Sequence, residues 1–238
     1  MANPQRWRGD REDRGGCAHG RLRPYRGDPA PRRQSPGLAT TVRPAVFLDR
    51  DGVVNRRPPA GTYVTYVAEF DVLAGVPEAI RRLNDTGFLV CVVTNQRGLA
   101  LKALSEGALT GIHAEFGRRL SVAGAALAGV YVCPHDLDAG CACRKPRPGL
   151  LVQAAAEHGI DLSLSWMIGD SESDILAGKR ARCRTIFIGT AAPRGGAEAI
   201  PDFVAPDLPR AVDLIMRTVA EGAGDPPASV RGDGPGGR

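Results

Sequence analysis

The chain has 238 residues, of which 43% are apolar and 24% charged, a composition typical of one globular domain with a sizeable core. It lacks the run of roughly 20 apolar residues that spans a bilayer, and we expect no secretory signal. Together with the composition, this excludes membrane-spanning, fibrous and wholly disordered classes of protein. The net charge of +5 is concentrated in residues 1–43, where 10 arginines outnumber 4 acidic residues.

The two ends of the chain differ in composition from its middle. Residues 1–43 are rich in Arg, Gly and Pro and too poor in large apolar residues to offset chain entropy, so we predict a disordered arm. A solvated tail, or translated sequence upstream of the natural start, explains it better than a nucleic-acid contact, because no aromatic stacking pattern accompanies the arginines. Residues 222–238 are predicted to be a second disordered tail, which leaves 44–221 as the folded domain.

Between these ends, strand and helix patterns alternate. In chain order we predict strand 45–49, helix 77–86, strand 88–94, helix 104–120, strand 129–133, helix 150–158, strand 166–169, helix 174–181, strand 185–189 and helix 211–219. Repeated strand–helix units predict an α/β fold, with a Rossmann-like, mostly parallel sheet covered by helices on both faces.

Two acidic clusters follow predicted strands. Asp49 and Asp51 follow the first strand, and Asp170 and Asp174 follow the fourth. Ligands of open α/β sheets sit at the carboxyl ends of strands, and Gly52 permits the necessary turn. Loop solvation or helix capping would explain either cluster alone. Both clusters at equivalent positions favour a hard, oxygen-preferring cation such as Mg²⁺.

Groups able to bind a phosphate occur at two other places. Thr94, Asn95 and Gln96 end the second strand and offer a hydroxyl and loop N–H groups. Arg144 and Lys145 offer a guanidinium fork and a point charge. Taken singly, Thr94 could cap a helix and Lys145 could be an ordinary surface charge.

Four possible metal ligands precede Lys145. Cys133, His135, Cys141 and Cys143 form the pattern Cys-x-His-x₅-Cys-x-Cys. Three thiolates and one imidazole form a closed tetrahedral zinc shell, which predicts a structural site. Unrelated free cysteines are the alternative, and a disulfide is disfavoured because nothing indicates export. A zinc ion bound to these four residues would hold the adjacent Arg144 and Lys145 in place.

The order of Asp49-x-Asp51, Thr94, Lys145 and Gly169-Asp170-x-x-x-Asp174 resembles the haloacid dehalogenase superfamily over about residues 45–216. In this superfamily an aspartate attacks phosphorus and forms an aspartyl-phosphate. The resemblance implies that Asp49 is this nucleophile, and that Asp51 protonates the leaving oxygen and then activates water.

The same resemblance implies the remaining roles. Mg²⁺ would be held by the Asp49 carboxylate, the Asp51 main-chain carbonyl and Asp170. Asp174 would order the surroundings of the metal. Residues expected to contact the substrate are Arg50, Thr94, Asn95, Gln96, Arg144 and Lys145.

A narrower likeness adds a substrate class. The run from Phe47 to Asn55, the Thr-Asn-Gln triplet and the Cys-rich segment leading into Arg-Lys-Pro are similar to D-glycero-D-manno-heptose-1,7-bisphosphate 7-phosphatases and related histidinol-phosphatases. This implies a cytoplasmic monomer without a large cap domain, with a pocket shaped by loops 55–72 and 97–104 and by the zinc loop. Its substrate would be a small phosphorylated sugar, and its product a heptose 1-phosphate used for nucleotide-activated heptose. We expect no membrane partner, and a nucleic-acid partner is disfavoured.

Several positions depart from the family pattern, namely Leu101, Leu137 and Ser171. They leave the chemistry intact and keep other substrates open, including histidinol phosphate and a nucleic-acid end phosphate. A non-catalytic scaffold is the alternative of a different class. The complete acidic set argues against a scaffold, because clustered carboxylates repel one another.

Overall fold

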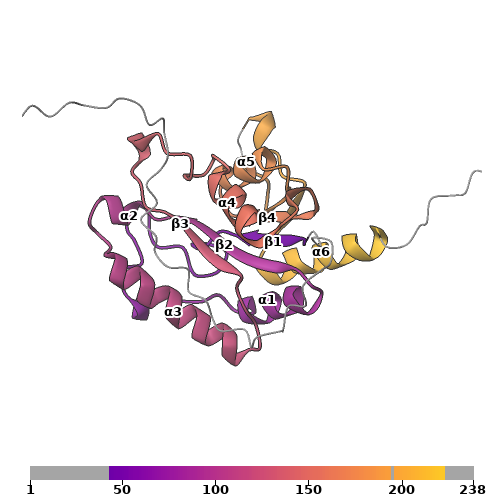
Figure 1. Cartoon of the computed structure of the whole chain (residues 1–238), viewed down its shortest axis with the longest axis horizontal. Coiled ribbons are helices and arrows are strands. Elements are labelled where there is room, and N and C mark those ends of the chain that lie inside the picture. Colours follow the sequence, from indigo (N-terminus) through magenta and orange to yellow (C-terminus); the bar gives the residue numbers. More distant parts are fainter. Residues whose placement is uncertain (1–42, 194–195, 223–238) are drawn as a thin grey trace, which may run out of the picture.

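The computed structural model describes residues 43–193 and 196–222, which form a six-stranded parallel sheet in the order β3-β2-β1-β4-β5-β6 (Figure 1). The predicted arm and C-terminal tail lie outside the described residues, apart from Arg43 and Gly222. No described helix is long and apolar enough to cross a membrane. The strands are β1 (Ala45–Leu48), β2 (Leu89–Asn95), β3 (Gly129–Cys133), β4 (Trp166–Gly169), β5 (Arg184–Ile188) and β6 (Phe203–Ala205).

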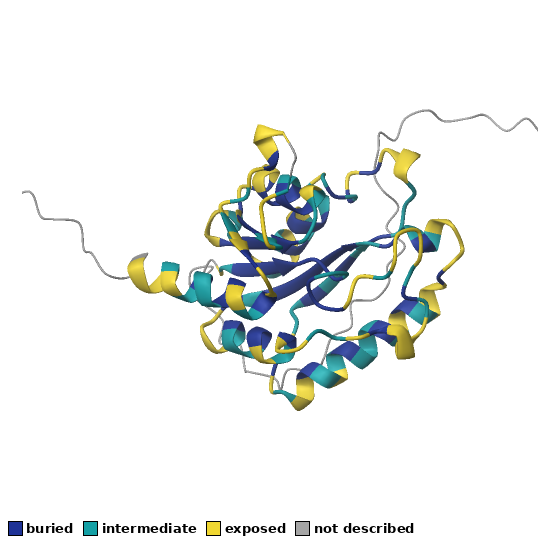
Figure 2. Ribbon diagram, turned by 180° about the vertical axis from the view of Figure 1, so that it is seen from behind, coloured by how far each residue is buried: buried dark blue, intermediate teal, exposed yellow. Residues whose placement is uncertain are grey.

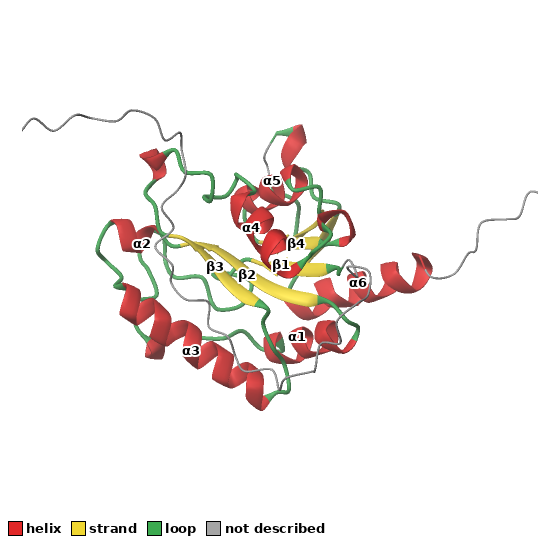
Figure 3. Ribbon diagram, viewed as in Figure 1, coloured by secondary structure: helices red, strands yellow, loops and turns green. Residues whose placement is uncertain are grey.

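Helices cover both faces of this sheet (Figures 1 and 3). Strand alternation sends Val46 and Leu48 of β1 into the core shared with α1, α3 and α6, and Ala45 and Phe47 into the core shared with α4 and α5. The central strands are consequently buried on both sides (Figure 2). The α-helices are α1 (Val76–Asp85), α2 (Arg97–Ala100), α3 (Glu106–Val122), α4 (Gly149–His158), α5 (Glu172–Arg180) and α6 (Leu208–Gly222).

These elements confirm the predicted fold class. The predicted strands and helices all form, and α6 begins at Leu208, before the predicted start. The sequence analysis did not predict β6, α2 or four short 3-10 helices. β6 has only three residues at the sheet edge, too few to show a period. Within the described residues, no segment between strands folds into a separate cap domain.

The order of the strands fixes the place of the site. β1 lies between β2 and β4, so the chain runs outward from β1 to β3 and then returns to β4 on the other side. Leu48 pairs with Ile168, and the Asp49 N–H donates to the carbonyl of Ile168 at 2.9 Å. The carboxyl ends of β1 and β4 therefore meet at the switch point, where open α/β sheets bind ligands.

Helix α5 lies unusually close to the sheet at Gly178. A Cβ atom there would lie 2.7 Å from Met167 Cβ and 2.8 Å from Thr185 Cγ2. Gly111 of α3 is the opposite case, because its nearest neighbour, Val67 Cγ2, would be 3.9 Å away. The absence of a side chain at Gly178 is thus a packing requirement.

We predict that Gly178→Ala lowers the free energy of unfolding by about 1–3 kcal/mol through overpacking, despite the better helix propensity of alanine. Gly111→Ala removes the same conformational freedom without a clash, and should raise stability by roughly 0.5–1 kcal/mol. Urea denaturation of both variants measures the difference. A stabilised Gly178→Ala would contradict the close approach of α5 to the sheet.

Candidate active site

A cavity of about 410 Å³ opens at the carboxyl ends of β1, β2 and β4. Asp49 and Asp51 follow β1, Thr94 lies in β2, and Ser171 follows β4. The loop after β1 closes one side of the cavity. The lining residues are Asp49, Asp51, Arg57, Pro58, Pro59, Ala60, Gly61, Thr62, Tyr63, Thr94, Asn95, Lys145, Ser171 and Ser173.

Lys145 supplies a buried positive charge at the floor of this cavity. Its Nζ lies 2.7 Å from Asp49 Oδ1, 2.6 Å from Asp174 Oδ1 and 2.8 Å from the carbonyl oxygen of Val93. Burial favours the neutral amine, but the charges of Asp174 and Asp49 outweigh it and raise the pKa of Lys145. The ammonium therefore stays charged and holds Asp49 in place.

Asp49, Asp170 and Asp174 form a carboxylate cluster, and the Lys145 ammonium contacts two of its members, Asp49 and Asp174. Each member of the cluster offers an oxygen within 4.8 Å of the others. Burial, followed by the charge of Asp174, raises the pKa of Asp49 to about 7, even though Lys145 opposes the shift. Lys145 alone thus does not balance the charges of Asp49 and Asp174, and the all-oxygen set fits a hard divalent cation. The Asp51 carboxylate is outside this cluster.

Two glycines make room for the cluster. A Cβ on Gly52, where φ is +100°, would lie 1.7 Å from Asp170 Oδ2. A Cβ on Gly169 would lie 2.1 Å from Asp174 Cβ. Only residues without a side chain let the β1 and β4 ends bring these carboxylates together.

Asp51 has a different environment from Asp49. Its carboxylate accepts hydrogen bonds from the Arg50 guanidinium at 2.9 Å, from Asn55 Nδ2 at 2.9 Å and from Gln96 Nε2 at 3.0 Å. Burial would raise the pKa of Asp51, but the charge of Arg50 and these hydrogen bonds outweigh it and lower that pKa. Asp51 is therefore a fixed, ionised carboxylate facing the cavity.

Three residues expected to contact substrate have side chains elsewhere. Arg50 is 1% exposed and its guanidinium is committed to Asp51. Gln96 is equally buried and donates to Asp51 and Thr94. Arg144 donates to the carbonyl of His135 at 3.3 Å and does not line the cavity. Their positions assign the Arg50 and Gln96 side chains to orienting Asp51 and Thr94.

Asn95 links the substrate side of the site to the Lys145 loop. Its amide donates to the Lys145 carbonyl and accepts from the Lys145 N–H, both at 3.1 Å. Such a two-point contact fixes the backbone of Lys145 against the end of β2. Asn95 also lines the cavity, as does Thr94.

The loop after β1 contains a residue that the sequence analysis did not single out. Arg57 lines the cavity and forms a two-pronged ion pair with Asp170, with Nε 2.8 Å from Oδ2. Within the expected pocket loops, residues 57–63 line the cavity, whereas 97–104 do not. The adjacent Arg56 and Arg57, so close to Asp51, were the available signal, but nothing in the sequence distinguished one from the other.

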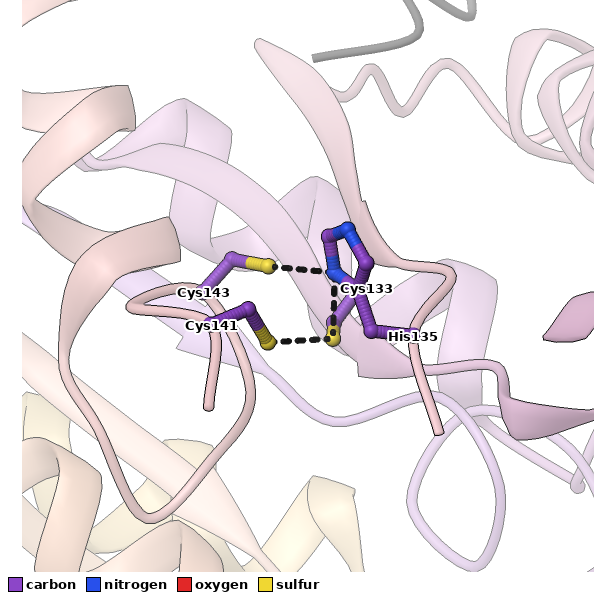
Figure 4. A group of neighbouring side chains, drawn as sticks. All are labelled: Cys133, His135, Cys141 and Cys143. Carbon is purple, nitrogen blue, oxygen red and sulfur yellow. Dashed lines mark hydrogen bonds between the residues drawn. The ribbon is translucent and has the colours of Figure 1, made fainter. Parts of the chain in front are cut away.

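Cys133, His135, Cys141 and Cys143 lie together as predicted and form a cysteine cluster beside the site (Figure 4). Cys133 Sγ lies 3.7 Å from Cys141 Sγ, and His135 Nδ1 lies 3.2 Å from Cys143 Sγ. Hydrogen bonding from Cys143 outweighs burial and lowers the pKa of Cys133 to about 5. Metal–sulfur bonds of about 2.3 Å in a tetrahedron require similar sulfur separations, so the cluster fits zinc.

The cysteine cluster is joined directly to the floor of the cavity. Cys143 is two residues before Lys145, and the carbonyl of Cys133 accepts a hydrogen bond from the Gln96 N–H at 2.8 Å. Arg147 donates to the carbonyl of Cys141 at 2.6 Å. The loop that carries Lys145 is thereby held at both its cluster end and its helix end.

Comparison with known proteins agrees with this geometry. The HAD-hydrolase-like family model matches residues 142–211. A Thermosynechococcus vestitus protein named D-glycero-D-manno-heptose-1,7-bisphosphate 7-phosphatase is 36% identical over 195 residues, covering 75% of this chain and 98% of that protein. A Yersinia pestis protein named D-glycero-beta-D-manno-heptose-1,7-bisphosphate 7-phosphatase is 37% identical over 181 residues, covering 71% and 95%.

A solved structure is similar as well. The D,D-heptose 1,7-bisphosphate phosphatase of B. bronchiseptica, crystallised with magnesium and phosphate, has a TM-score of 0.67 and 34% identity, over 74% of this chain and 99% of that one. The fold and the acidic strand ends thus define a HAD-like hydrolase. Within that class, the chain belongs to the D-glycero-D-manno-heptose-1,7-bisphosphate 7-phosphatase family.

We predict that Lys145→Met lowers the free energy of unfolding by about 3–5 kcal/mol, because Asp49 and Asp174 lose their buried counter-charge. Lys179→Met removes an exposed cation from α5 and should change stability by at most about 0.5 kcal/mol. Urea unfolding without added metal compares them. Equal midpoints for the two variants would contradict a charge-balancing role for Lys145.

Proposed function

We propose that this chain is a Mg²⁺-dependent phosphatase that removes the 7-phosphate of D-glycero-D-manno-heptose 1,7-bisphosphate and releases heptose 1-phosphate, a precursor of nucleotide-activated heptose. The observation that carries the proposal is the carboxylate of Asp49, fixed by Lys145 at 2.7 Å at the floor of an open cavity. The names of the relatives, which the chain matches over nearly their whole length, support the substrate.

Asp49 is proposed as the nucleophile. Its carboxylate attacks phosphorus, and an aspartyl-phosphate forms as the sugar oxygen leaves. Lys145 orients Asp49 and, with Thr94, stabilises charge on the transferring phosphoryl group. Asp174 is too deeply buried to reach the substrate, and it positions Lys145 instead.

Asp51 is proposed as the general acid that protonates the leaving sugar oxygen, and then as the general base that activates water. In the resting site Arg50 holds its carboxylate ionised, which suits the later step, in which Asp51 takes a proton from the attacking water. For the first step Asp51 must itself carry a proton. A phosphate dianion entering the cavity beside it disfavours the ionised form, and so raises its affinity for that proton.

The proposed ligands of Mg²⁺ are the carboxylates of Asp49 and Asp170 and the main-chain carbonyl of Asp51. The ion would neutralise charge that Lys145 leaves uncompensated and polarise the phosphoryl group. The oxygen-rich carboxylate cluster and the raised pKa of Asp49 support this assignment.

Zinc is proposed as the occupant of the cysteine cluster, in a structural role. We further propose that residues 44–221 constitute the catalytic domain, acting as a monomer in the cytoplasm. The continuous sheet and its two cores, formed within this range, support the domain boundaries. The monomeric state and the location stay predictions.

We predict Mg²⁺-dependent phosphate release from the heptose bisphosphate, reduced on the order of a thousandfold or more by Asp49→Asn. Asp71→Asn is the matched control, because the Asp71 side chain is exposed, pairs with Arg56 and does not line the cavity. A panel with histidinol phosphate and a 3′-phosphorylated oligonucleotide tests the substrate. Equal rates for wild type and Asp49→Asn would reject Asp49 as the nucleophile.

We predict about one zinc per chain, lost in Cys141→Ser but retained in Cys183→Ser, since Cys183 is buried outside the cluster. Loss of zinc should loosen the Lys145 loop and lower turnover while leaving Asp49 itself intact. Elemental analysis and phosphate release, measured on the same samples, decide this. Full activity after complete zinc removal would contradict the structural coupling.

A further inference from the structure

Arg57 forms an ion pair with Asp170, whose carboxylate the proposed function assigns to a metal. Its guanidinium contacts both oxygens of Asp170, one of them at 2.8 Å, and the Asp170 side chain is only 14% exposed. A guanidinium fork and a divalent cation both approach a carboxylate through its oxygens. Because both are positive, they repel each other at one carboxylate, so metal and Arg57 compete for Asp170.

Among the described residues, Arg57 is also the one cation that lines the cavity with an exposed side chain. Its side chain is 53% exposed, whereas Lys145 is buried and has three acceptors. Arg50 and Arg144 do not line the cavity. A bisphosphate brings a second dianion, and Arg57 is the charge available to receive it.

The backbone around Arg57 is suited to a change of side-chain partner without a change of loop. Pro58 and Pro59 restrict the chain that follows, and Thr62 closes a turn on Pro59 through its N–H at 3.0 Å and its hydroxyl at 2.7 Å. The guanidinium lies at the end of a long, rotatable stem. It can therefore leave Asp170 while residues 58–63 keep lining the cavity.

We propose that Arg57 exchanges partners during binding. In the metal-free chain it neutralises Asp170, on Mg²⁺ binding it leaves that carboxylate, and it then binds the phosphate of the sugar bisphosphate that does not react. The second half of this exchange rests on the proposed function. Arg57 thus sets the preference for a bisphosphate over a monophosphate.

The first half is tested by isothermal titration of the metal-free protein with Mg²⁺ alone. Without a competing guanidinium, Arg57→Gln should bind Mg²⁺ about two- to fivefold more tightly than wild type, the range typical of an ion pair with one exposed partner. Arg56→Gln is the control, because Arg56 is a neighbouring arginine paired with the exposed Asp71. Equal dissociation constants for Arg57→Gln and wild type would overturn the exchange.

The second half is tested by comparing the heptose 1,7-bisphosphate with the heptose 7-phosphate. In Arg57→Gln the ratio of the two kcat/KM values should fall on the order of tenfold to a hundredfold, mainly through KM for the bisphosphate. Arg57→Lys should recover part of the ratio. An unchanged ratio in an otherwise active protein would overturn the phosphate contact. A wild type that hydrolyses neither sugar would overturn the proposed function, and the contact with it.

Discussion

The pairing of one buried ammonium with two buried carboxylates is the interaction on which this site depends. Lys145 lies 2.7 Å from Asp49 and 2.6 Å from Asp174, and all three are almost fully buried. Uncompensated charges in such a place cost several kcal/mol each. The same pairing aims the Asp49 oxygens, so stability and reactivity share one set of contacts. The proposed nucleophile, Asp49, can be buried here only because a cation is buried with it.

Because Lys145 must stay beside Asp49, the loop that carries Lys145 is held at several points. Asn95 holds its main chain at two points from the end of β2, and the cysteine cluster holds the preceding residues against the end of β3. A loop has little packing of its own to resist thermal motion. Side-chain contacts within the cysteine cluster at its start and a two-point hydrogen bond at Lys145 replace that packing. The position of Lys145 relative to Asp49, which follows β1, is therefore controlled by contacts of its loop with the ends of β2 and β3.

The fold and the grouping of residues into one site could be predicted from the sequence. The fold follows from hydrophobic periodicity, and the grouping follows because the carboxyl ends of parallel strands lie at one edge of the sheet. Asp49, Asp170, Asp174 and Lys145 were expected together and lie together. The directions of the arginine side chains were not predictable. Arg50 points into the protein and Arg57 into the cavity, a distinction made by tertiary contacts with Asp51 and Asp170. The sequence shows that an arginine is present, but not which carboxylate its guanidinium pairs with in the folded chain.

Asp49 and Asp51 carry the same carboxyl group, but their different surroundings shift their pKa values in opposite directions. In the protein by itself, the pKa of Asp49 is raised to about 7 and that of Asp51 is lowered. The proposed roles need the opposite order, an ionised nucleophile and a protonated acid. A divalent cation beside Asp49 favours its ionised form, and a phosphate dianion beside Asp51 favours its protonated form. Under the proposed roles, each carboxylate would reach its reactive state through a different binding event, and the nucleophile and the acid would be ready together only with both metal and substrate bound.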